Sequence, residues 1–123
     1  MDKNSETSLH MYVPNERTMK VSGKTIPIKA AQAAHSILNQ NNLMPEFFYI
    51  GGNAGQQAMK AMSILRYRFA LESPDLTLAF VPVRVLCQIK EDEQLKDAVV
   101  WRSIILQQPN DEITDFSRRS PLA

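Results

Sequence analysis

This sequence of 123 residues lacks internal disulfides and long apolar runs. Cys87 is the only cysteine, so no internal disulfide can form and we expect a reducing compartment. No apolar run approaches the ~20 residues that a membrane helix needs, and residues 1–6 carry no apolar signal region. We therefore expect a cytoplasmic protein without membrane contact, a location that is compatible with association with the nucleoid.

Residues suited to catalysis or metal binding are equally scarce. The two histidines, His10 and His35, do not combine with Cys87 into a cluster of ligand spacing. Neither His-Glu-x-x-His nor Gly-x-Ser-x-Gly occurs. The acidic residues 91–93 crowd a predicted hairpin tip, where water screens their charges and general acid catalysis is not expected. We therefore predict that the protein is not an enzyme and has no metal, cofactor or small-molecule substrate.

The net charge of +1 is divided unevenly along the chain. Residues 18–109 carry ten basic against seven acidic side chains, a net of +3, whereas residues 1–17 and 110–123 are each −1. A modestly basic body permits binding to a polyanion without requiring it. Both ends are polar and without periodicity, which predicts two flexible tails around one domain at 18–109. A small apolar group in the first tail is an exception and could dock on the body or on a partner: Leu9, Met11, Tyr12 and Val13.

Apolar periodicity predicts a β-α-β-α order followed by two or three strands. The expected strands are 18–22, 46–50, 76–81, 83–90 and 98–106, and the expected helices are 27–41 and 54–71. Pro82 separates the third and fourth strands unless it is a bulge in one long strand. Thr25 is the expected N-cap of the first helix, with Pro27 in its first turn. The order predicts a two-layer α/β (α+β) sandwich, with both helices on one face of a mixed sheet.

Glycines mark the junction between the second strand and the second helix. The run Phe47–Ile50 stops at Gly51 and Gly52, and a helical pattern with Gly55 near its start follows. This arrangement predicts a strand, a tight turn and a helix, with amide groups left uncovered at a helix N-terminus that favours phosphate. A purely structural corner remains the alternative, because the dinucleotide fingerprint and the Gly-Lys-Ser/Thr of a phosphate-binding loop are both missing.

Three segments resemble the stage V sporulation protein S family: Met19–Pro27, Ile50–Ala61 and Phe80–Ile89, the last including Pro82. The resemblance spans roughly residues 18–109 in one register and leaves out both tails. That family is similar to the Alba-like nucleic-acid-binding proteins, whose fold is a β-α-β-α-β-β sandwich. The resemblance implies a non-catalytic protein that binds DNA or RNA and acts as a developmental or gene-expression regulator.

The resemblance also implies where nucleic acid would bind. Alba-like proteins build their polyanion surface from the first strand-to-helix loop, the second strand-to-helix turn and an extended hairpin. Lys24 matches a lysine of the first loop, whereas Gly51 and Asn53 stand where basic residues are typical and residues 91–93 are acidic. These departures weaken the expected binding, because phosphate contacts supply most non-specific affinity. The predicted nucleic-acid-binding residues are Lys20, Lys24, Thr25, Gly52, Asn53, Gln56, Gln57, Lys60 and Arg84.

Two apolar residues of the second helix, Met59 and Ile64, lie outside its core stripe on opposite flanks. Since Alba-like relatives form dimers, the resemblance implies a homodimer or higher homo-oligomer with these residues at the interface. A competing function is that of a small oligomeric adaptor that binds proteins and little nucleic acid. A basic surface around Lys24 and 51–57 favours the first function, and a neutral surface with an apolar patch at Met59 and Ile64 favours the second.

Overall fold

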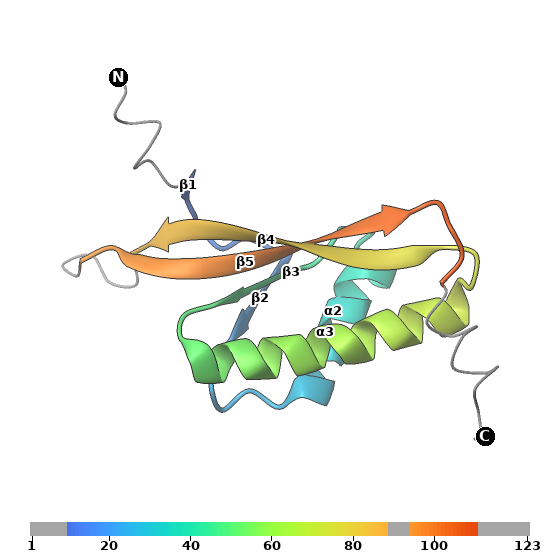
Figure 1. The fold of residues 1–123 in the computed structure, drawn as a ribbon, viewed down its shortest axis with the longest axis horizontal. Helices are drawn as coiled ribbons and strands as arrows, with labels where there is room; N and C mark the ends of the chain where they lie inside the picture. Colours follow the sequence, from blue (N-terminus) through green and yellow to red (C-terminus); the bar gives the residue numbers. More distant parts are fainter. Residues whose placement is uncertain (1–9, 89–93, 111–123) are drawn as a thin grey trace.

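The computed structural model describes residues 10–88 and 94–110 and confirms the predicted two-layer arrangement. Helices α2 (Pro27–Gln40) and α3 (Gly52–Glu72) pack on one face of a mixed sheet (Figure 1). The order β1-β4-β5-β3-β2 places β2 parallel to β3 and β1 parallel to β4, while β5 is antiparallel to β3 and to β4. The strands are β1 (His10–Met11), β2 (Thr18–Val21), β3 (Glu46–Tyr49), β4 (Thr77–Cys87) and β5 (Lys96–Leu106).

The larger core lies between the helices and the sheet. Phe47 and Leu78 supply large side chains from the strands, and Leu65 supplies one from α3. Alanines on both helices let the backbones approach the sheet and each other closely, because an alanine side chain is a single methyl group. The predicted core stripe of α3 is buried as expected: Ala54, Ala58, Ala61, Met62, Leu65 and Phe69.

Strand β4 runs without interruption through Pro82, which lies opposite Trp101 of β5. The alternative of one long strand is therefore the correct one for this part of the chain. The amide of Tyr12 donates to the carbonyl oxygen of Leu86 at 2.8 Å, so the backbone groups of Leu86 face the outer edge of β4. Residues two apart in a strand point their backbone groups the same way, so Pro82 also faces that edge. Its missing N–H therefore removes no hydrogen bond to β5.

Residues 12–17, called the strap below, lie on the sheet face opposite the helices. β1 leads into the strap and pairs with β4 at Val85 and Leu86. Tyr12 is buried and its ring stacks on Phe48, with the ring centroids 5.2 Å apart. Residues 10–17 were predicted to belong to a flexible tail; instead β1 pairs with the sheet and Tyr12 packs on the body, as in the docking alternative, whereas Met11 and Val13 are exposed. Tyr12 joins a second core cluster with Phe48, Val85, Cys87, Ala98 and Val100.

The phenol of Tyr12 fixes the strap through polar contacts. Its hydroxyl donates to Oε1 of Glu46 at 2.9 Å and also contacts the hydroxyl of Thr18. Burial, assisted by the nearby Glu46 carboxylate, raises the pKa of Tyr12 to about 12. The phenol therefore keeps its proton and remains a hydrogen-bond donor to Glu46. The other carboxylate oxygen of Glu46 lies 3.7 Å from Nε of Arg102, so this buried acid has a charged partner.

Neither of the described helices is both long and apolar enough to cross a membrane.

Candidate nucleic-acid interface

The glycine turn (residues 51–55) begins α3 without a capping side chain. Gly51 is the N-cap residue, and the first helical hydrogen bond runs from the amide of Gly55 to the carbonyl oxygen of Gly51 at 3.0 Å. No acidic residue lies in the first turn of this 21-residue helix. The positive end of the helix dipole and its first amides are therefore not neutralised by a local carboxylate. Such an end favours an anion.

The three glycines of this turn have different physical roles. Gly51 has a φ of +91°, a conformation that side chains strongly disfavour. A Cβ on Gly55 would lie 3.0 Å from the ring of Tyr49, so a glycine is needed for close packing. A Cβ on Gly52 would meet nothing within 4 Å. Folding therefore accounts for Gly51 and Gly55 but not for Gly52, whose missing side chain leaves the backbone open to approach.

The loop between β2 and α2 holds Lys24 in a turn built from its own hydrogen bonds. The amide of Ser22 donates to Oγ1 of Thr25 at 2.8 Å, and the amide of Lys24 donates to Oγ of Ser22 at 3.2 Å. Thr25 was predicted to be the N-cap of α2, and this is wrong. Ile26 holds that position, and its apolar side chain makes no capping hydrogen bond, whereas the Thr25 hydroxyl is engaged within the loop.

The Lys24 loop and the glycine turn lie next to each other. Nε2 of Gln57 donates to the carbonyl oxygen of Gly23 at 3.5 Å. A Cβ on Gly23 would lie 3.3 Å from Cβ of Asn53, so the two loops are also in close packing contact. This contact follows from the parallel pairing of β2 with β3, which brings the ends of both strands to the same edge of the sheet.

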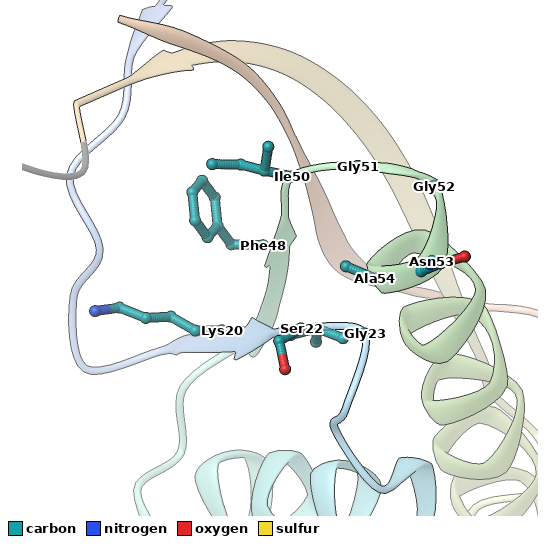
Figure 2. Close-up of a pocket in the computed structure, with 10 residues that line it drawn as sticks. Lys20, Ser22, Gly23, Phe48, Ile50, Gly51, Gly52, Asn53 and Ala54 are labelled. Carbon is teal, nitrogen blue, oxygen red and sulfur yellow. The ribbon is translucent and has the colours of Figure 1, made fainter. Parts of the chain in front are cut away.

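The two loops border an open hollow of about 510 Å³ at this edge (Figure 2). Figure 2 shows Lys20, Phe48 and Ile50 pointing to one side, away from α3, while Asn53 projects from the first turn of that helix. Among the described residues that line the hollow, Lys20 is charged and none is acidic. The full lining is Lys20, Val21, Ser22, Gly23, Phe48, Ile50, Gly51, Gly52, Asn53 and Ala54.

The other predicted binding residues lie at varying distances from this hollow. Asn53, Gln56 and Lys60 are exposed and recur at helical spacing, so they form one ridge that leads away from the turn. Arg84 does not line the hollow. It lies on the β4–β5 hairpin, where its guanidinium pairs with the carboxylate of Asp97 at 3.1 Å.

A second hollow of about 310 Å³ adjoins the first beneath the strap. Its lining contains Lys20 and Phe48, which also line the first hollow. Pro14 and Phe48 were not among the predicted site residues. Strand alternation could have placed Phe48, because it puts this residue on the opposite face from Phe47 and in register with Lys20. The complete lining is Pro14, Lys20, Phe48, Cys87 and Gln88.

Exposed apolar residues on α3 form two further features. Met59 is 53% exposed and borders a groove of about 280 Å³ between α3 and the sheet, together with Phe80 and Trp101. Ile64 is 37% exposed and lies at helical spacing with two other exposed residues, Tyr67 and Leu71. Both predicted interface residues are thus accessible, on opposite sides of the helix.

The acidic residues 91–93 lie outside the described residues, so the predicted acidic hairpin tip has no structural account here. Within residues 10–88 and 94–110, no three His, Cys, Asp or Glu side chains come together as a metal site. A comparison with models of known protein families gives no match to this chain. A comparison with curated proteins likewise gives no match.

Proposed function

We propose that this protein is a non-catalytic nucleic-acid-binding protein of the stage V sporulation protein S or Alba-like type, acting as a gene-expression or developmental regulator. The observation that carries the proposal is the hollow at the glycine turn. It combines the uncapped N-terminus of α3 with Lys20, lies beside the Lys24 loop, and has no acidic residue among its described lining. A phosphate backbone fits such a surface, because phosphate oxygens accept hydrogen bonds from amides and are attracted to ammonium groups.

The β-α-β-α-β-β order supports the same proposal, since it is the order that the sequence resemblance implies. Gly52 supports it further. A side chain there would meet nothing within 4 Å, so packing does not explain why a glycine stands at the start of α3. The surface carries few cations, and Arg84 is engaged with Asp97. Binding should therefore be moderate in strength and should depend on salt through a small number of phosphate contacts.

A salt titration with fluorescently labelled DNA and RNA of matched sequence tests this function. If Lys20, Lys24 and Lys60 contact phosphates, log affinity should fall against log salt with a slope of about −2 to −3 for each bound protomer. Absence of binding to both nucleic acids at low salt would contradict the proposal. A slope near zero would also contradict it, because the contacts would then not involve phosphate.

The adaptor function has its own supporting observation, namely the groove beside Met59 together with the exposed ridge at Ile64, Tyr67 and Leu71. An apolar helix face of this kind suits contact with another protein. The two functions differ in what they require of the Lys24 loop. Replacing Lys24 should impair nucleic-acid binding and leave protein association intact, whereas a protein that is only an adaptor should show no nucleic-acid binding to lose.

A further inference from the structure

The hollow beneath the strap lies immediately beside the proposed phosphate-binding surface. The two hollows, of about 510 and 310 Å³, share Lys20 and Phe48 as walls, so they lie side by side and are called the two lobes of one recess below. The lobe at the glycine turn is bordered by residues 51–54 at the start of α3, and the lobe beneath the strap is bordered by Pro14, Phe48 and Cys87. The wall from the strap is Pro14, and the strap lies outside the segment that carries the family resemblance.

The two lobes differ in the chemistry they accept. An anionic group suits the first lobe, which is bordered by the glycine turn at the start of α3 and by Lys20, its charged lining residue. A flat, largely apolar group suits the second, whose lining residues are mostly apolar, with Lys20 and Gln88 as its polar side chains. A nucleotide carries both groups, a phosphate and a base, joined through one sugar. Lys20 borders both lobes and therefore lies where the phosphate and the sugar would meet.

We propose that this recess holds one unpaired nucleotide of a nucleic-acid strand, with its phosphate at the glycine turn and its base beneath the strap. This inference rests on the proposed function and adds the class of nucleic acid. A base inside a duplex is paired at its edge and stacked on both faces, so it cannot enter a hollow without first leaving the helix. The protein should therefore bind single strands or unpaired positions in preference to continuous duplex.

The experiment compares a labelled single strand of about ten nucleotides with the blunt duplex of the same sequence, as DNA and as RNA, by fluorescence anisotropy at one low salt concentration. The unmodified protein should bind the single strand on the order of tenfold more tightly, as expected when one base is held by a protein surface. A mononucleotide serves as a third ligand. It should bind much more weakly than the strand, because the ridge formed by Asn53, Gln56 and Lys60 contacts only a longer ligand.

Two substitutions close the lobe beneath the strap from opposite sides, Pro14→Trp from the strap and Gln88→Trp from the end of β4. Either should reduce the affinity for the single strand to that for the duplex while leaving duplex binding unchanged. Val13→Trp is the matched control, because Val13 lies next to Pro14 on the strap and is 72% exposed. Circular dichroism confirms that each variant is folded, and two independent closing variants guard against one that fails to fold.

The possible results separate this inference from the proposed function. Equal affinity of the unmodified protein for single strand and duplex, or unchanged affinity in both closing variants, would overturn the inference and leave nucleic-acid binding in place. A mononucleotide that binds as tightly as the strand would also overturn it, since the occupant would then be a free nucleotide. Failure to bind any nucleic acid at low salt would overturn both proposals.

Discussion

Gly52 and Gly55 are three residues apart, yet packing requires only one of them. Gly55→Ala should destabilise the fold by about 1–3 kcal/mol, because the new methyl group would press against the ring of Tyr49. That ring cannot move freely, since its hydroxyl accepts a hydrogen bond from Nε1 of Trp101 at 3.1 Å. Gly52→Ala should leave stability unchanged or raise it by up to about 1 kcal/mol, while nucleic-acid affinity falls.

Urea denaturation measures the two stabilities, and fluorescence anisotropy measures the two affinities. The comparison is internally controlled, because both variants add one methyl group to the same helical turn. If Gly52→Ala binds nucleic acid as tightly as the unmodified protein, the open backbone at Gly52 does not contact the ligand.

Lys24 is the residue for which a loss of phosphate contact is expected without any loss of structure. Lys24→Glu should weaken binding and reduce the magnitude of the salt slope by about one unit, the contribution of one phosphate contact. The side chain is exposed, and the loop is ordered by Ser22 and Thr25 through hydrogen bonds that do not involve it. Melting temperature should therefore not change. An unchanged slope in a folded variant would remove Lys24 from the interface.

Helices α2 and α3 are joined by a polar contact near the end of α3, and this contact predicts a dependence on pH. Nε2 of His35 lies 2.8 Å from Oε1 of Glu72. The hydrogen bond from His35 lowers the pKa of the Glu72 carboxyl. A carboxyl with a lowered folded-state pKa stabilises the fold above its unfolded pKa, and this contribution is lost as the pH falls through the folded-state value.

Glu72→Gln should therefore lower the melting temperature by about 1–4 °C near neutral pH, and the difference should shrink on acidification. The effect is small because Glu72 is partly exposed. Asp75→Asn, at an exposed position in the following turn, serves as a control. A difference that persists undiminished at about pH 3, where an ordinary carboxyl is protonated, would contradict the role given to the pair.

The main elements could be predicted from the sequence because their apolar patterns are local. The α3 stripe and the alternation in β4 and β5 depend on residues a few positions apart, which the sequence shows directly. β1 was missed because it has two residues, and its place depends on pairing with Val85, which is far away in the sequence. β5 begins at Lys96, two residues before the predicted start, because Asp97 and Lys96 extend the pairing with β4.

The candidate site likewise has one part that the sequence could predict and one part that it could not. Lys24, Gly52 and Gln57 could be brought together by sequence reasoning, since β2 and β3 lead into helices on the same face of the sheet. The strap wall could not be predicted, because nothing within residues 12–17 specifies that Tyr12 stacks on Phe48. The ion pair between Arg84 and Asp97 could not be predicted either, because it depends on the register in which β4 and β5 pair.

At the scale of the whole molecule, the exposed residues of α3 predict self-association. Ile64→Glu should give a folded species of lower mass, because a charge in an apolar interface is costly to bury. Nucleic-acid affinity should fall by tenfold or more, since two linked sites bind one strand with a high effective concentration. Light scattering measures the mass, and Gln32→Glu on the exposed face of α2 is the matched control. A monomer for the unmodified protein at micromolar concentration would refute this assembly.

The pairing of β1 with β4 also has a consequence for how the chain folds. β4 and β5 form a hairpin of eleven paired positions, whereas β1 contributes two and pairs with a strand that is far away in the sequence. Closing such a long loop costs conformational entropy, and the two paired positions offset little of that cost. The hairpin should therefore form first and the strap should close last. During synthesis, β1 leaves the ribosome long before its partner exists. In native-state hydrogen exchange, the Tyr12 amide should therefore exchange faster than the amides of β5, through an opening that leaves the rest of the molecule folded.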